Sequence, residues 1–182
     1  AMNTRIRKLI GSFQEYNIDA FLVTKDINIQ YLTRFPASES WLLVSPQGSF
    51  YITDFRYILE AKEELKGVKI HQYTKSIYPA VAELARRLQL KKIGFDSRHL
   101  NVFQYDHLKK SAASDLKFVK TDHIVEDLRE IKDAGEIQKI RQALKVHGQA
   151  LQFLKKVIKP GVLEKEVLRR LEDFVRERGV EF

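Results

Sequence analysis

Residues 41–52 read Trp41-Leu42-Leu43-Val44-Ser45-Pro46-Gln47-Gly48-Ser49-Phe50-Tyr51-Ile52. Two apolar runs flank a short polar turn, which is typical of two strands joined tightly. Pro46 at the second turn position and Gly48 at the fourth favour a type I turn. The stretch therefore predicts a β-hairpin, around which the other elements must be arranged.

Extended and helical segments alternate on both sides of the hairpin. The expected strands are 20–23, 41–44, 49–52, 68–73, 92–95 and 116–119, and the expected helices are 4–16, 26–32, 54–65, 76–88 and 101–110. Asp26, Asp54 and Ser76 stand where helix N-caps are expected. The alternation predicts an α/β fold with a mixed sheet of about six strands and helices on both faces.

The pattern changes after Thr121. Asp133 and Glu136 have the spacing of a capping box, and apolar residues then follow in steps of three and four, which predicts a helix of about 25 residues. Lys159-Pro160-Gly161 ends it, and a second helix follows. We therefore expect an α/β domain over residues 1–128 and a helical segment over 129–182. The apolar faces of the two helices in 129–182 must pack against the first domain, another subunit or a sheet that this chain lacks.

The composition is that of a folded protein: 182 residues, 44% hydrophobic and 10% aromatic. The formal net charge is +8, but basic residues are mixed with acidic ones along the helices, so we expect no nucleic-acid binding. No apolar run approaches the roughly 20 residues that span a bilayer, so we expect no membrane insertion. The absence of cysteine excludes disulfides and is compatible with the cytoplasmic location that we expect.

The residues present do not suggest an independent catalytic site. The five histidines are His71, His99, His107, His123 and His147, and no two have helical i, i+4 or strand i, i+2 spacing. Asp96 lies close to His99, but a pair without a third ligand is weak support for zinc. Neither a Gly-rich phosphate loop nor a Gly-x-Ser-x-Gly elbow is present. We therefore expect no catalytic residue, metal ligand or bound cofactor in this chain.

Three motifs carry a resemblance to a known family. They are Asn28-Ile29-Gln30-Tyr31-Leu32-Thr33-Arg34-Phe35, then Ile52-Thr53-Asp54-Phe55-Arg56-Tyr57, and a tail that contains Leu128-Arg129-Glu130-Ile131-Lys132 and Pro160-Gly161-Val162-Leu163-Glu164-Lys165-Glu166-Val167. They span nearly the whole chain, and three in the right order are more specific than any one. On these motifs the chain resembles the creatinase/prolidase/aminopeptidase P family of pita-bread metallopeptidases.

The resemblance implies a ribonuclease-H-like N-terminal domain and a linking helix that leads into a pita-bread catalytic domain. In that family, two Asp, one His and two Glu of the catalytic domain hold two divalent ions, commonly manganese or cobalt, which activate water to attack the bond before proline. This chain ends before those ligand motifs. We therefore expect the non-catalytic N-terminal portion of an Xaa-Pro dipeptidase or aminopeptidase, truncated before the catalytic domain and inactive alone.

The resemblance also implies a homodimer that acts on proline-containing peptides, in which the loop after the first motif borders the partner's substrate pocket. The pocket candidates are Arg34, Phe35, Glu39, Trp41 and Arg56. Phe35 is expected to pack on substrate, and Arg34 or Glu39 to read a terminal charge. The family usually has Gly where this chain has Arg34, and Arg56 also has a purely structural interpretation.

Two other functions stay open. The chain could belong to a catalytically inactive protein-binding module of the same fold, or to a creatinase-like amidohydrolase that works without metal. Residues up to 182 do not distinguish a dipeptidase from an aminopeptidase, because that choice depends on how the pocket treats the carboxyl end of the substrate.

Overall fold

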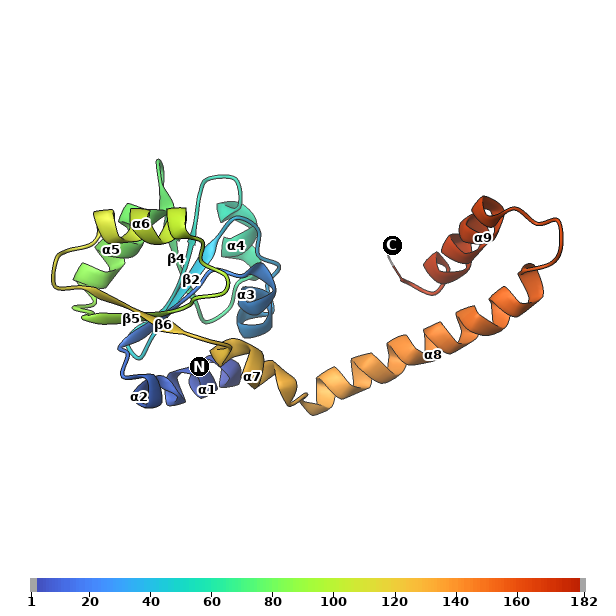
Figure 1. The fold of residues 1–182 in the computed structure, drawn as a ribbon, viewed down its shortest axis with the longest axis horizontal. Helices are drawn as coiled ribbons and strands as arrows, with labels where there is room; N and C mark the ends of the chain where they lie inside the picture. Colours follow the sequence, from blue (N-terminus) through green and yellow to red (C-terminus); the bar gives the residue numbers. More distant parts are fainter. Residues whose placement is uncertain (1–2, 181–182) are drawn as a thin grey trace. The chain divides into compact units, whose positions relative to one another are not determined.

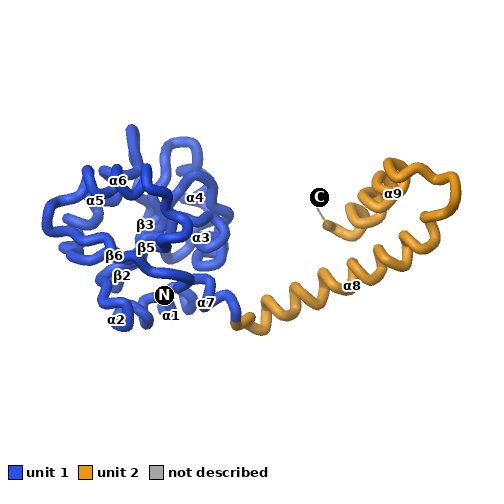
Figure 2. The backbone as a smooth tube through the Cα atoms, in the orientation of Figure 1, with its two compact units in different colours: residues 1–130 blue, residues 131–182 orange. Residues whose placement is uncertain are grey.

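The computed structural model describes residues 3–180. The chain divides into two compact units, unit 1 over residues 1–130 and unit 2 over residues 131–182 (Figure 2). The sequence placed this division after residue 128. Unit 1 contains the sheet, and unit 2 consists of two helices with their connection.

The sheet of unit 1 has six strands in the order β4-β3-β2-β1-β5-β6. They are β1 (Ala20–Val23), β2 (Trp41–Ser45), β3 (Gly48–Thr53), β4 (Lys69–Gln72), β5 (Lys92–Asp96) and β6 (Lys117–Thr121). β1 pairs in parallel with β5, β5 with β6, and β3 with β4, whereas β2 is antiparallel to both β1 and β3. Among the described strands, β2 alone therefore runs against the others. The mixed six-stranded sheet that the sequence predicts is confirmed.

The central hairpin has the predicted boundaries. Trp41 lies opposite Ile52, and Ser45 lies opposite Gly48. Neither Pro46 nor Gln47, the two turn residues between them, has a positive φ, which agrees with the predicted type I turn. Gly48 has a φ of 147°, a value that favours glycine, and the Ser45 hydroxyl donates to its carbonyl oxygen at 2.9 Å.

Helices cover both faces of the sheet. Successive residues of a strand point to opposite sides, so each buried strand contributes apolar side chains to a core on each face. Phe21, Leu42 and Tyr51 contribute to the core on one face, whereas the adjacent Leu22 and Leu43 contribute to the other. The first face is covered by α1 (Thr4–Gly11), α2 (Phe13–Tyr16), α3 (Asp26–Thr33), α4 (Ile58–Glu64) and α7 (Ile124–Glu130). The second is covered by α5 (Ile77–Arg87) and α6 (Val102–Ser111), as Figure 1 shows.

Three local details differ from the sequence prediction. The helix expected over 4–16 is broken at Ser12, whose hydroxyl donates to the Leu9 carbonyl at 2.8 Å. Asp26 is the first residue of α3 rather than its cap, and Lys25 occupies the cap position without a side-chain bond. Helix α7 was not predicted, since a segment of seven residues is too short to show helical periodicity clearly.

Unit 2 contains the long helix α8 (Ala134–Val157) and the helix α9 (Glu164–Arg176). The predicted capping box is present: the Asp133 side chain accepts from the Glu136 N–H, and the Glu136 side chain accepts from the Asp133 N–H, both at 2.9 Å. The rings of Phe153 and Phe174 stack at 4.4 Å between the two helices. Within residues 3–180, no helix combines the length and apolar character that crossing a membrane demands.

Gly94 tests the packing of β5 against the first face. A Cβ at this position would lie 2.7 Å from Ile18 Cδ1 and 3.0 Å from Phe21 Cδ2, both too close for carbon atoms. We expect Gly94→Ala to lower the free energy of unfolding by about 1–3 kcal/mol through overpacking, as measured by urea denaturation. In Gly11→Ala, nothing lies within 4 Å of the added methyl group, so this helical control should gain up to about 1 kcal/mol. Equal stability of the two variants would contradict the packing.

Candidate functional site

One end of the sheet gathers the residues of the candidate site. The segment 34–40, here called the rim loop, joins the end of α3 to the start of β2. Because β2 runs against its neighbours, the rim loop enters the sheet at the end where β1 and β3 leave it. The turn after β3 carries Asp54 and Arg56 and lies at this same end.

Two rim-loop residues have left-handed backbones although neither is glycine. Arg34 has a φ of 63° and a ψ of 16°, and its N–H closes the end of α3 by donating to the Gln30 carbonyl at 2.7 Å. Glu39 has a φ of 47°. This conformation costs a residue with a Cβ roughly 1–2 kcal/mol. Such strain is often found at functional sites, which makes the rim loop a reasonable candidate.

Arg56 binds two carboxylates with its guanidinium group. Its Nε and Nη2 donate to Asp54 Oδ2 at 3.0 and 2.7 Å, and Nη2 also donates to Glu39 Oε2 at 2.6 Å. The Arg56 N–H donates to Asp54 Oδ1 at 2.9 Å. These contacts tie Glu39, and with it the end of the rim loop, to the turn after β3.

The prediction that Asp54 caps a helix is wrong. Helix α4 begins only at Ile58, with Tyr57 in the cap position, so Asp54 lies too far upstream to reach its first N–H groups. The carboxylate of Asp54 binds Arg56 instead. An aspartate followed two residues later by an arginine favours this local pairing. It takes the place of the first helical turn that the sequence predicted after Asp54.

The charges of this cluster are mutually stabilised. Hydrogen bonds from the Arg56 side chain are the main cause that lowers the pKa of Asp54, and they outweigh its burial. The same bonds to Asp54, and then those to Glu39, raise the pKa of Arg56. Nearby, Asp26 shifts the other way: burial is the main cause that raises its pKa, and Glu39 adds to the rise while His99 opposes it.

Two of the predicted pocket residues belong to the core of unit 1. Phe35 is only 3% exposed, and its ring meets the Tyr51 ring edge-on at 5.6 Å. Trp41 is 6% exposed and packs against Tyr78, at 5.5 Å, in the core on the other face. Both side chains therefore anchor the chain at the two ends of the rim loop in the core, while the surface of the candidate site is formed by Arg34, Glu39 and Arg56.

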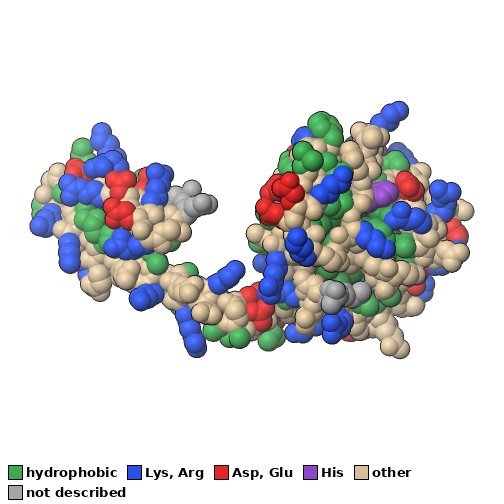
Figure 3. All heavy atoms as spheres, turned by 180° about the vertical axis from the view of Figure 1, so that it is seen from behind, with side chains coloured by type: hydrophobic (Ala, Val, Ile, Leu, Met, Phe, Trp, Pro, Cys, Tyr) green, Lys and Arg blue, Asp and Glu red, His purple; other side chains and the backbone are tan. Residues whose placement is uncertain are grey.

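Arg34 is an exposed cation that, like Lys62 and Lys75, forms no ion pair within the described residues. Basic and acidic side chains are interspersed on the surface (Figure 3), and many of them pair. Arg98 lies 2.8 Å from Asp122, for example, and Lys25 lies 3.1 Å from Glu126. The structure thus brings Arg56 together with Glu39 and leaves the guanidinium of Arg34 without an ion pair in residues 3–180.

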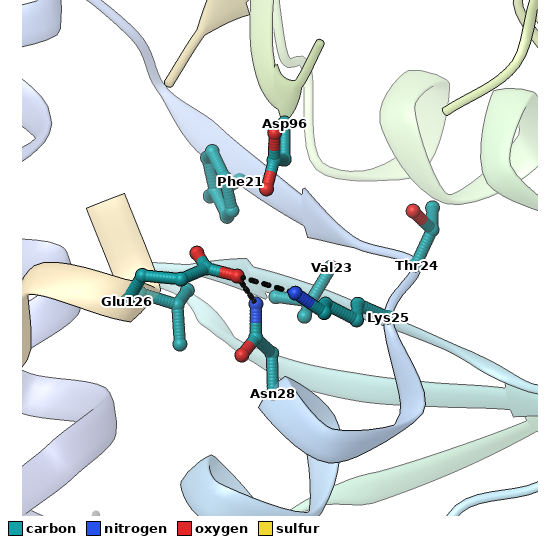
Figure 4. Close-up of a pocket in the computed structure, with 8 residues that line it drawn as sticks. Phe21, Val23, Thr24, Lys25, Asn28, Asp96 and Glu126 are labelled. Atoms are coloured by element: carbon teal, nitrogen blue, oxygen red, sulfur yellow. Dashed lines mark hydrogen bonds and ion pairs between the residues drawn. The ribbon is translucent and has the colours of Figure 1, made fainter. Parts of the chain in front are cut away.

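A second polar group, which the sequence analysis missed, lies where α3 meets α7 (Figure 4). Glu126 Oε1 accepts from Lys25 Nζ at 3.1 Å and from Asn28 Nδ2 at 2.9 Å, and Asn28 Oδ1 accepts from Arg129 at 2.8 Å. Asn28 is 2% exposed. The cavity beside them has a volume of about 10 Å³, which suits one water molecule. The group therefore fixes α7 rather than forming a substrate pocket.

No group of three or more His, Asp or Glu side chains within residues 3–180 is arranged to hold a metal ion. The family resemblance implies a two-metal centre in the catalytic domain and not among these residues, so we assign no chemical step to them.

Asp54 and Asp26 should affect acid stability with opposite signs. The pKa of Asp54 is lowered by folding, so its stabilisation is present above the ordinary value of about 3.9 and is lost as pH falls through the lower, folded pKa. In Asp54→Asn, the fall in unfolding free energy below about pH 4 should be smaller than in the wild type. Urea denaturation at a series of pH values measures this.

Asp26→Asn provides the matched control. Because folding raises the pKa of Asp26, the wild type loses stability as pH rises from about 4 through that pKa, and the variant should not show this loss. If the free energy of unfolding of Asp54→Asn falls below about pH 4 by as much as that of the wild type, the pairing of Asp54 with Arg56 is contradicted.

Comparisons with known proteins agree with this architecture. The chain is 30% identical to the uncharacterized peptidase YqhT of Bacillus subtilis (strain 168), over 97% of this chain and 50% of that protein. It resembles the solved structure of an Xaa-Pro dipeptidase from Bacillus anthracis with a TM-score of 0.87 and 32% identity, over 96% of this chain and 48% of that one. It also resembles the solved structure of an X-Pro aminopeptidase from Thermotoga maritima MSB8, with a TM-score of 0.83 and 28% identity, over 97% of this chain and 50% of that one.

The chain thus spans about half the length of these three relatives. The family model of the creatinase/prolidase N-terminal domain matches residues 5–131, which cover the whole sheet, helices α2 to α7 and α1 except its first residue. By this match the chain belongs to the creatinase/prolidase N-terminal domain family.

Proposed function

We propose that this chain is the non-catalytic N-terminal portion of a metal-dependent peptidase that hydrolyses the peptide bond before proline. The observation that carries the proposal is the match along nearly the whole chain to proteins named Xaa-Pro dipeptidase and X-Pro aminopeptidase. Both names occur among relatives of similar identity, so they support the reaction class and do not separate a dipeptidase from an aminopeptidase.

In this proposal, unit 1 supports a homodimer and its rim loop borders the substrate pocket of the partner subunit. The strained backbones of Arg34 and Glu39 support a functional loop. Arg56 holds Glu39 in place, and Arg34 is an exposed cation of the same loop that can bind a carboxylate. A guanidinium group suits this task because it forms paired hydrogen bonds to a carboxylate. Arg34 would therefore read the free carboxyl end of a dipeptide.

The catalytic half of the proposed enzyme lies outside this chain. There we expect two divalent ions, manganese or cobalt, to activate the attacking water. The residues of unit 1 would contribute substrate positioning only.

The first test is to read the coding frame beyond Phe182, express the complete protein and assay it with Gly-Pro. We expect hydrolysis that EDTA abolishes and Mn²⁺ restores, and no hydrolysis by residues 1–182 alone, because the metal ligands would lie downstream. A downstream domain that lacks the two Asp, one His and two Glu, or a complete protein without activity, would instead favour an inactive protein-binding module.

Arg34→Gly separates the strain of the rim loop from its function. Glycine accepts the left-handed backbone, so the free energy of unfolding should rise by up to about 1 kcal/mol. In the complete enzyme, KM for Gly-Pro should rise about tenfold through loss of a charge-assisted hydrogen bond. KM for the C-terminal amide of Gly-Pro should stay unchanged, since the amide carries no charge.

Gln89→Gly is the matched control for Arg34→Gly. Gln89 also has a left-handed backbone, with a φ of 54°, but it follows α5, away from the rim loop. We expect a similar gain in stability with no change in KM for either substrate. A KM for Gly-Pro that Arg34→Gly leaves unaltered would refute charge reading by Arg34.

A further inference from the structure

The large apolar side chains that unit 1 exposes all lie at one end of its sheet. Among the described residues of unit 1, they are Ile27 (45% exposed), Phe55 (72%), Leu59 (73%), Val102 (77%) and Phe103 (64%). One exposed apolar side chain is ordinary, because much of any protein surface is apolar. Five at the same end of a sheet, with none elsewhere on the described part of unit 1, need an explanation.

The strand directions determine this position. Phe55 and Leu59 follow β3, and Ile27 follows β1. Val102 and Phe103 begin α6, which follows β5. Because β1, β3 and β5 run in the same direction, these segments lie at the end of the sheet where the rim loop enters β2. The order β3-β2-β1-β5 therefore puts apolar side chains on both sides of the rim loop. We call this end of unit 1 the rim end.

The fold holds Phe103 in its exposed position. The residue lies in the first turn of α6, whose start is fixed by a capping box between Asn101 and Gln104. The ring centroids of Phe103 and His107 are 4.0 Å apart, and those of His107 and Tyr78 are 5.2 Å apart. A ring supported on a fixed backbone loses little conformational entropy on binding, which favours an interface anchor.

Phe55 is a second aromatic side chain on a fixed backbone. It lies between Asp54 and Arg56, whose side chains are joined by hydrogen bonds of 3.0 and 2.7 Å. An aromatic residue buries about 150–250 Å², so the exposed parts of Phe55 and Phe103 together offer roughly 200–340 Å². A standard interface buries about 800 Å² per partner, of which somewhat more than half is apolar. The two rings alone would thus supply roughly half of that apolar area.

The charges of the rim end favour a protein partner. Arg34 and Arg56 are basic, whereas Asp26 and Glu39 are acidic, and Arg56 is paired with Glu39. Nucleic acids and anionic lipids bind to surfaces that are predominantly basic. Charges of both signs around apolar anchors are typical of a protein–protein interface with an apolar centre and a polar rim.

We propose that the rim end is the docking surface for a second copy of the complete protein, with Phe55 and Phe103 as its anchors. The proposed function places the rim loop at the pocket of the partner subunit, and the rim end is continuous with that loop, so the inference rests on the proposed function. The part of the partner that it contacts is then the half that carries the pocket, outside residues 1–182. We therefore expect the complete protein to be a dimer and residues 1–182 alone to be monomeric.

Sedimentation velocity of the complete protein tests the docking surface. Phe55→Glu combined with Phe103→Glu should raise the dissociation constant of the dimer roughly a hundredfold or more, because two anchors are replaced by charges. Phe55→Leu combined with Phe103→Leu keeps the apolar contact and should leave most of the dimer intact. Gln14→Glu is the matched control: it adds the same charge at an exposed position of α2, which precedes β1 at the opposite end of the sheet, and should not change the dissociation constant.

The double Glu variant of residues 1–182 is the control for folding. Both rings are mostly exposed, so its melting temperature should stay within about two degrees of the wild type. Val102→Glu tests the same surface without removing either ring, and it should also weaken the dimer. A monomeric complete protein, or a dimer that the Glu variants leave intact, would overturn the proposal. A dimer of residues 1–182 would overturn it as well, because the downstream half would then not be needed.

Hydrolysis of Gly-Pro distinguishes failure of this inference from failure of the proposed function. If the complete protein hydrolyses Gly-Pro and the double Glu variant stays dimeric, the docking surface is wrong while the peptidase function stands. If the double Glu variant dissociates but the wild-type dimer does not hydrolyse Gly-Pro, the docking surface stands and the peptidase function fails.

Discussion

The reversed direction of β2 is the constraint on which the candidate site depends. A sheet in which every neighbour ran parallel would place the entry to β2 at the opposite end from the exits of β1 and β3. Because β2 is antiparallel to both, the rim loop meets the turn after β3, and Arg56 can reach Glu39. The tight hairpin at Pro46 and Gln47 makes this reversal possible with few residues.

The site combines an ion-paired cluster with an exposed cation that makes no ion pair within the described residues. Arg56 and Asp54 form a closed pair whose charges are satisfied locally, and Glu39 is attached to it. Arg34 carries its charge on a strained backbone without such a pair. Backbone strain in a position where glycine would relax is often found at functional sites. The buried residues Phe35 and Trp41 give this surface a firm base.

Most of the architecture could be predicted from the sequence, since it depends on local patterns. The hairpin, the alternation of strands with helices and the capping box at Asp133 each have signals within a few residues. Side-chain partners were harder to predict. Asp54 had the spacing of a cap but binds Arg56, and Phe35 lies in a loop but is buried against Tyr51. Contacts such as Asn28 with Arg129 join distant parts of the chain, and no local pattern indicates them.

The order of strands in the sheet also determines when unit 1 can fold during synthesis. β1 lies between β2, which follows it closely in the chain, and β5, which is made much later: Phe21 pairs with Gly94. Pairing between strands far apart in the sequence is slow, and one edge of β1 stays unpaired until β5 has been synthesised. The sheet is complete at Thr121, and α7 then covers it with Ile124 and Val125. All strands of unit 1 precede unit 2 in the chain, so the sheet does not need unit 2 to form, and until β5 has been made the open edge of β1 is exposed to aggregation.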